Sequence, residues 1–206
     1  MSKGQIYIVD DDEAVRESLD ALLGSFGYET TTFESARAFL GTCAADAKGC
    51  LLADIRMPDM DGLELQERAA ISHPSLAVVI ITGHGDVPLA VRAMKAGAVD
   101  FVEKPFTEDV ILHAVENAAR SVEARGRKTA SDPNIARRLD LLTPREREVL
   151  EGLVAGLPNK TIAYDLGISP RTVEIHRARV MDKMQARSLS ELVRMALTAG
   201  IGDPKP

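Results

Sequence analysis

Short apolar runs alternate with amphipathic segments over the first half of the chain. The runs lie at residues 5–9, 29–33, 50–54, 76–82 and 98–103. Each is continuous rather than alternating with polar residues, as expected for parallel strands that are covered on both faces. The segments between them have helical spacing of apolar residues, and right-handed strand–helix–strand connections follow. This pattern predicts an α/β fold with an open, doubly wound sheet of five parallel strands.

The second half shows only helical patterns. Thr143, Pro144 and Glu146 form a helix-start signal with a capping box. Three further helices are predicted to begin at polar caps, namely Asn159, Ser169 and Ser188. Gly167 ends the second helix of the set. The pattern predicts an all-α, four-helix domain that contains a helix-turn-helix.

The formal net charge of −6 is unevenly distributed along the chain. Residues 1–124 contain 21 acidic and 10 basic side chains, whereas residues 125–206 contain 10 acidic and 15 basic ones. Such a division indicates two domains with different partners, the basic one suited to a polyanion. We therefore expect domains at residues 1–123 and 139–206, joined by a linker at residues 124–138.

Neither a signal-peptide pattern nor an 18-residue apolar run is present in the sequence, so we expect a cytoplasmic protein without a membrane span. The two cysteines, Cys43 and Cys50, are too few for a disulfide framework. We expect both thiols to be reduced.

Polar side chains stand at the carboxyl ends of the predicted strands, where doubly wound folds place their sites. They are Asp10 and Asp11 after the first strand, Asp54 at the third, Thr82 at the fourth and Lys104 after the fifth. Carboxylates on one edge suit Mg²⁺. A carboxylate can also attack phosphorus to form an aspartyl phosphate, with an ammonium group neutralising the phosphoryl oxygens. Asp54 is the predicted nucleophile.

The helix that begins after Ser169 has two different faces. Val173, Val180 and Met184 fall on one side at 100° per residue and form the predicted core face. The opposite face is mixed and includes Ile175 and Ala178 beside charged residues. Small apolar side chains can meet thymine methyl groups and arginines can pair with guanine, so this face is suited to reading DNA.

The segments IVDDDE, LLADIRMPDMDG, VIITGHGD and FVEKPF resemble the flavodoxin-like receiver domain of two-component response regulators. The resemblance implies that Asp54 accepts a phosphoryl group from a histidine kinase. It also implies that Asp11, Asp54 and the backbone carbonyl of Arg56 ligate Mg²⁺, while Asp10 assists through water.

The same resemblance assigns a switch. Thr82 would move toward the phosphoryl group, Phe101 would turn inward, and Lys104 would contact the phosphoryl oxygens. The Lys104–Pro105 peptide bond would be cis. Two phosphorylated receivers would pair through the fourth helix and the fifth strand.

The segments LTPREREVL, GLPNKTIAYDLGIS and RTVEIHRARVMDKM are similar to the LuxR-type helix-turn-helix. By that pattern Glu174, Ile175 and Ala178 face base edges. The expected phosphate contacts are Lys160, Thr172, His176, Arg177, Arg179 and Lys183.

A receiver followed by this module resembles the FixJ/NarL class of response regulators, nearest the FixJ branch. The resemblance implies a non-enzymatic transcriptional activator with a FixL-like oxygen-sensing histidine kinase, promoter DNA and RNA polymerase as partners. Nitrogen-fixation and microaerobic genes would be its targets. Three alternatives remain open: the same class in another pathway, a Mg²⁺-dependent phosphohydrolase with an aspartyl nucleophile, and an interaction module that acts without phosphorylation.

Overall fold

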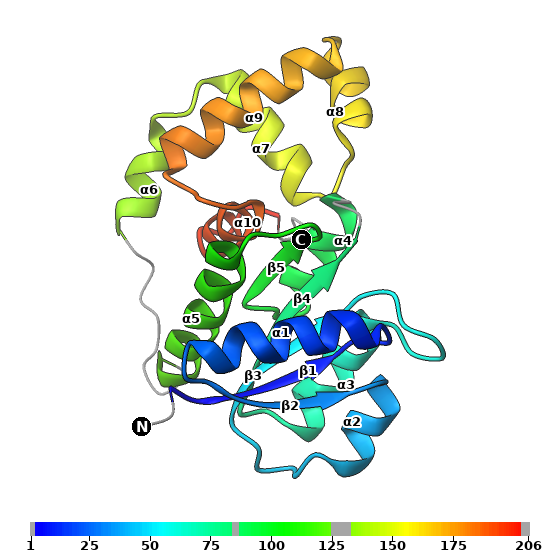
Figure 1. Ribbon diagram of the computed structural model, residues 1–206. Helices are drawn as coiled ribbons and strands as arrows, with labels where there is room; N and C mark the ends of the chain where they lie inside the picture. The colour runs from blue at the N-terminus through cyan, green and yellow to red at the C-terminus, as the bar shows by residue number, and fades with distance from the viewer. Residues whose placement is uncertain (1–2, 84–86, 125–132, 203–206) are drawn as a thin grey trace. The chain divides into compact units, whose positions relative to one another are not determined.

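The computed structural model describes residues 3–83, 87–124 and 133–202. They form two compact units, which are described separately (Figure 1). The first unit contains described residues 3–83 and 96–124, and the second contains 87–95 and 133–202. The second unit thus includes α4 (Val87–Lys95), which chain order assigned to the first domain.

The first unit is built on a parallel sheet of five strands in the order β2-β1-β3-β4-β5. The strands are β1 (Gln5–Val9), β2 (Glu29–Phe33), β3 (Gly49–Asp54), β4 (Leu76–Thr82) and β5 (Asp100–Glu103). The predicted doubly wound fold is confirmed. β5 is shorter than predicted, because a turn with Gly97 at φ 94° precedes it.

Four helices of this unit cover the two faces of the sheet (Figure 1). They are α1 (Glu13–Ser25), α2 (Ala36–Thr42), α3 (Gly62–Ser72) and α5 (Glu108–Ala124). Leu19 and Leu23 of α1 share one core cluster with Ile111 of α5 and with Ile6 and Ile8 of β1. The intervening Tyr7 points to the other face, where its ring lies 6.0 Å from that of Phe39 in α2. Successive strand residues therefore serve opposite layers.

The second unit has a helical core. Besides α4 it contains α6 (Pro133–Asp140), α7 (Pro144–Val154), α8 (Asn159–Leu166), α9 (Pro170–Met184) and α10 (Leu189–Thr198). Val149, Leu150, Val173, Val180 and Met184 are fully buried in it. The predicted core face of the third helix of the set is confirmed. The capping box of Thr143 and Glu146 is present as predicted.

Four helices follow the expected linker as predicted, and the structure adds helical residues at both ends of the linker itself. α5 continues to Ala124, and residues 133–138 of the expected linker belong to α6. This short helix is held because Leu139 is buried and Ile135 packs against the same core. Arg138 adds hydrogen bonds to the carbonyl of Met184, at 3.2 Å, and to Oε1 of Gln185. Arg138 lies far from Met184 and Gln185 in the sequence, so local sequence patterns could not predict these contacts.

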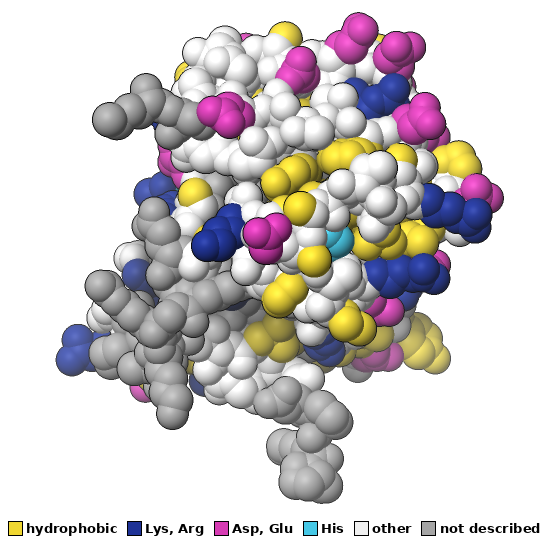
Figure 2. Space-filling model, turned by 90° about the horizontal axis from the view of Figure 1, so that it is seen from below, with side chains coloured by type: hydrophobic (Ala, Val, Ile, Leu, Met, Phe, Trp, Pro, Cys, Tyr) yellow, Lys and Arg dark blue, Asp and Glu magenta, His cyan; other side chains and the backbone are white. Residues whose placement is uncertain are grey.

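The surface combines apolar and charged side chains. On the face drawn in Figure 2, hydrophobic side chains gather around a histidine and are bordered by lysine and arginine side chains. Cys43 and Cys50 are free thiols, as expected. Within the described ranges, the model contains no helix that is both long enough and apolar enough to span a membrane.

Candidate functional site: a carboxylate–lysine edge and a helix-turn-helix

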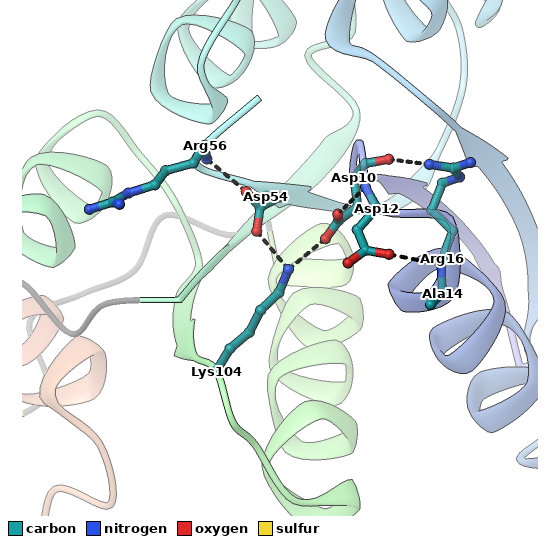
Figure 3. Close-up of polar contacts among 7 residues, drawn as sticks. All are labelled: Asp10, Asp12, Ala14, Arg16, Asp54, Arg56 and Lys104. Carbon is teal, nitrogen blue, oxygen red and sulfur yellow. Dashed lines mark hydrogen bonds and ion pairs between the residues drawn. The ribbon is translucent and has the colours of Figure 1, made fainter. Parts of the chain in front are cut away.

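Three of the predicted site residues meet at the carboxyl edge of the sheet (Figure 3). Asp54 is the last residue of β3, Asp10 follows β1, and Lys104 follows β5. The Lys104 ammonium lies between the two carboxylates, 2.7 Å from Oδ2 of Asp10 and 2.7 Å from Oδ1 of Asp54. The side chains of Asp10 and Asp54 are only 3% and 9% exposed, so the ion pairs are shielded from water.

Backbone groups hold the second oxygen of each carboxylate. The N–H of Asp12 donates to Oδ1 of Asp10 at 2.9 Å, and the N–H of Arg56 donates to Oδ2 of Asp54 at 2.7 Å. Arg16 of α1 donates from Nη1 to the carbonyl oxygen of Asp10 at 2.7 Å. The two carboxylates are therefore held in fixed orientations by backbone N–H groups of the loops that follow β1 and β3 (Figure 3).

The electrostatics of this cluster reflect burial and pairing. Burial raises the pKa of Asp10, although hydrogen bonds from Lys104 and from the Asp12 N–H act in the opposite direction. Burial alone would lower the pKa of Lys104, but the hydrogen bonds to Asp10 and Asp54 outweigh it and raise that pKa. Lys104 therefore stays charged and offsets the repulsion between two buried carboxylates.

The loop after β3 is shaped by Asp61 and Gly62. Asp61 is the N-cap of α3, and its side chain accepts from the N–H of Glu64 at 2.7 Å. Gly62 must lack a side chain, because a Cβ there would overlap the carbonyl oxygen of Asp54. The structure thus places the start of α3 directly against Asp54.

The other predicted residues of this edge lie in different surroundings. Thr82 ends β4 and is fully buried. Phe101 in β5 is partly exposed, and the Arg56 side chain and Asp11 are exposed. The Lys104–Pro105 peptide bond is cis. Asp12, which sequence placed at a helix start, is the N-cap of α1 and accepts from Ala14 N–H at 2.9 Å.

The residues predicted to bind Mg²⁺ include the Asp10 and Asp54 carboxylates of this edge. Within residues 3–83, 87–124 and 133–202, no group of three or more His, Cys, Asp and Glu side chains is arranged to hold a metal ion. The Lys104 ammonium lies between Asp10 and Asp54. The donor chemistry nevertheless fits, since carboxylate oxygens beside the exposed Asp11 are hard ligands of the kind Mg²⁺ prefers.

The helix-turn-helix consists of α8 and α9, with Gly167 in the left-handed conformation between them at φ 65°. α9 begins at the predicted cap, because the Ser169 hydroxyl accepts from the Thr172 N–H at 3.1 Å. α8 begins differently from our prediction. Pro158 is its N-cap and makes no side-chain cap bond, while Asn159 is the first helical residue and its buried Oδ1 has no hydrogen-bond partner.

Most of the predicted DNA-contact residues are accessible. Exposed or partly exposed side chains are those of Lys160, Thr172, Glu174, Ile175, His176, Arg177, Ala178 and Arg179. Ile175 is 48% exposed on α9, so its apolar side chain is accessible on the face predicted to read DNA. Nδ1 of His176 is buried without a hydrogen-bond partner, so only part of that ring is available at the surface.

Lys183 differs from the rest of this set. Its ammonium donates to Oε2 of Glu146 at 2.7 Å and to the carbonyl oxygen of Leu141 at 3.1 Å. The LuxR-type resemblance implied a phosphate contact for Lys183, and that contact stays a prediction. In the structure the Lys183 ammonium neutralises a buried carboxylate, a contact that the packing of α9 against α7 creates.

Sequence reasoning also missed Arg16, which holds the backbone of Asp10. Its position in the first turn of α1, just after the acidic run, was compatible with an inward-reaching side chain, but helical spacing alone does not distinguish it from a surface arginine.

A sheet with a paired carboxylate–lysine edge, followed by a helix-turn-helix, defines a signal-receiving and DNA-binding class of protein. Comparison with protein families agrees. Residues 6–116 match the response regulator receiver domain, and residues 140–196 match the bacterial regulatory proteins of the luxR family.

Individual relatives are similar over nearly the whole chain. The transcriptional regulatory protein FixJ of Bradyrhizobium diazoefficiens is 52% identical over 97% of this chain and 98% of its own length. FixJ of Rhizobium meliloti is 51% identical over 98% of this chain and 99% of its own. The crystal structure of full-length FixJ from B. japonicum covers 97% of this chain and 98% of its own, with a TM-score of 0.58. The chain therefore belongs to the FixJ-like transcriptional response regulators, with a receiver and a LuxR-type DNA-binding domain.

Proposed function

We propose that Asp54 is the phosphoacceptor of this regulator and that its donor is a sensor histidine kinase of the FixL type. The observation that carries the proposal is the position of the Asp54 carboxylate. It ends a buried central strand, and its two oxygens are held by the Lys104 ammonium and the Arg56 N–H.

The chemistry is a phosphoryl transfer. A carboxylate oxygen of Asp54 forms a bond to phosphorus while the phosphorus–nitrogen bond of the phosphohistidine breaks, and the histidine nitrogen takes up a proton. Lys104 offsets negative charge on the phosphoryl oxygens, and its pKa, raised by the two carboxylates, keeps it protonated. The Arg56 N–H keeps the carboxylate turned toward the edge.

Asp11, Asp54 and the Arg56 carbonyl would hold Mg²⁺, with Asp10 assisting through water. When bound, the ion supplies positive charge to the phosphoryl oxygens. Because Lys104 bridges Asp10 and Asp54 in this structure, we infer that Lys104 shifts from these carboxylates toward the phosphoryl group.

The output that we propose is dimerisation. Thr82 would move toward the phosphoryl oxygens and Phe101 would fill the vacated space, which changes the surface of α4 and β5 through which two receivers pair. A dimer presents two reading helices to half-sites one helical turn apart, so linkage multiplies the affinity of each. Glu174, Ile175 and Ala178 would read bases. Recruitment of RNA polymerase would activate nitrogen-fixation and microaerobic genes.

The decisive experiment is intact-mass spectrometry with a small acyl phosphate and Mg²⁺. The wild type should gain one phosphoryl group, and Asp54→Asn should gain none. Asp59→Asn is the matched control, since Asp59 lies exposed in the loop after Asp54 with φ 66°, a conformation that asparagine tolerates. A normal mass gain in Asp54→Asn would exclude the assignment.

The output is tested on the same samples by light scattering and by DNA gel shift. Phosphorylated wild type should become dimeric and bind promoter DNA more tightly. Rapid multiple turnover of small phosphate esters would instead favour the phosphohydrolase. An unchanged oligomeric state and DNA affinity after full phosphorylation would favour an interaction module that acts without phosphorylation.

A further inference from the structure

A polar network connects α5 to the main chain of Phe101. Asp100, the first residue of β5, is only 5% exposed. Its Oδ1 accepts a hydrogen bond from the Phe101 N–H at 2.8 Å, and its Oδ2 accepts one from Nδ2 of Asn117 at 3.1 Å. β5 is an edge strand, and N–H groups of edge strands otherwise lack a ladder partner. The Asp100 carboxylate therefore fixes the backbone at Phe101.

The orientation of the Asn117 amide is determined from both sides. A carboxylate only accepts, so the nitrogen of the amide must face Asp100. The oxygen accepts a hydrogen bond from Nη2 of Arg120 at 2.7 Å. A flip of the amide would set its oxygen against the carboxylate and its nitrogen against the guanidinium, which removes both bonds.

This orientation dictates the protonation state of His113. Nδ2 of Asn117 also lies 3.1 Å from Nδ1 of His113, one helical turn earlier on α5. Because the amide nitrogen is a donor, Nδ1 must accept, and the ring proton must sit on Nε2. Protonation of Nδ1 would place an N–H group against the N–H of the amide.

We propose that Asn117 is a positioning residue for the Phe101 main chain and that His113, as the Nε2–H tautomer, accepts from Asn117 and helps to orient its amide toward Asp100. Without Asn117 the Asp100 carboxylate loses a donor, and the Phe101 backbone is held less firmly. The proposal rests on the proposed function for the role of Phe101 in switching, but its contacts do not depend on phosphorylation.

The tautomer is tested directly on the full-length chain by ¹⁵N NMR of the imidazole nitrogens at neutral pH. The expected spectrum shows Nε2 protonated and Nδ1 unprotonated. A spectrum with the proton on Nδ1 would overturn the proposal, because Asn117 could not then donate to it.

The positioning is tested by hydrogen exchange of the Phe101 amide in the full-length chain at neutral pH. Asn117→Ala removes a donor from Asp100 and should lower the protection of this amide about fivefold, the loss expected for one hydrogen bond. His113→Gln can still accept from Asn117 and should keep the wild-type protection.

Glu116→Gln is the matched control on the same helix and should keep the wild-type protection. Full protection of the Phe101 amide in Asn117→Ala would reject the positioning role. Phosphoryl gain at Asp54 is measured in parallel. If Phe101 protection depends on Asn117 but Asp54 gains no phosphoryl group, the proposed function is refuted and the network stands. If Asp54 is phosphorylated but Phe101 protection does not depend on Asn117, the network is refuted and the proposed function stands.

Discussion

The Lys183 ammonium donates to the Glu146 carboxylate at 2.7 Å and thereby links α9 to the start of α7. Oε2 of Glu146 also accepts from the Thr143 N–H at 2.8 Å, so one buried oxygen closes the capping box and the ion pair together. The Glu146 side chain is only 3% exposed and that of Lys183 is 32% exposed. The pair therefore fixes the recognition helix against its own domain.

Lys183→Ala should destabilise the DNA-binding domain, because it leaves a buried carboxylate without its cation. Loss of one partner of a buried pair costs about 3 kcal/mol, the lower end of the usual range, since Lys183 is partly exposed. Urea unfolding measures the change. Lys160→Ala, on the exposed side of α8, is the control and should alter stability by less than about 0.5 kcal/mol. Equal stability of the two variants would show that the ion pair contributes nothing.

The same pair predicts sensitivity to acid. The hydrogen bond from Lys183, against the effect of burial, lowers the pKa of Glu146 from 4.5 to about 2. A carboxyl whose pKa is lowered by folding contributes stability above pH 4.5 that is lost as the pH falls through about 2. Unfolding of the wild type should thus become easier over this range, while Glu146→Gln should be less stable at neutral pH and lose less on acidification. Parallel pH profiles would contradict the assignment.

Asp10→Asn should raise the stability of the protein in the absence of metal. Because burial raises the folded-state pKa of Asp10 above 3.8, the stability linked to its protonated form is present below pH 3.8 and is lost as the pH rises through the folded-state pKa. The neutral amide avoids that loss, and Lys104 keeps Asp54 as a partner. Urea midpoints at pH 4 and pH 7 measure the effect, which should be larger at pH 7. A lower midpoint at pH 7 would show that the pair with Lys104 outweighs burial.

Gly62→Ala should impair Asp54. The added Cβ would overlap the Asp54 carbonyl oxygen, and overpacking of this kind costs about 1–3 kcal/mol. We expect a lower melting temperature and slower phosphorylation by acyl phosphate. Gly24→Ala is the matched control, since no heavy atom lies within 4 Å of a Cβ there and alanine favours a helix by about 1 kcal/mol. Normal phosphorylation of Gly62→Ala would show that the loop can adjust without moving Asp54.

Exposed side chains of α8 and α9 should divide into two kinds, phosphate contacts and base contacts. Arg179→Ala and Lys160→Ala remove proposed phosphate contacts, so each should weaken binding equally for all sequences and lower the salt slope by about 1. Ile175→Ala should instead relax the preference at one base position. Binding measured over a salt series and over a set of operator variants separates the two. An unchanged preference in Ile175→Ala would remove this residue from the reading face.

Local patterns were sufficient for most of the elements and for the charged edge of the sheet. Continuous apolar runs end in Asp54 and Thr82, and parallel strands bring their carboxyl ends to one edge, so Asp10, Asp54 and Lys104 could be placed together from chain order alone. Helix caps at Thr143, Ser169 and Ser188 were equally readable, because a cap is a contact between neighbours in sequence.

Contacts between residues distant in sequence were beyond such patterns. The helical wheel indicated which way Lys183 faces, but not that the buried Glu146 lies within its reach. The apolar periodicity of α6 was too weak to predict this helix, because its stability depends on contacts of Leu139 and Arg138 with distant residues. The network of Asp100, Asn117 and His113 is also tertiary, because it needs an edge strand and a helix to lie side by side. Sequence by itself thus determined the elements, the class and the charged edge, through short-range periodicity and strand order. Only the packed structure decided which charged groups neutralise one another, because these ion pairs join residues that are distant in sequence and come together on folding.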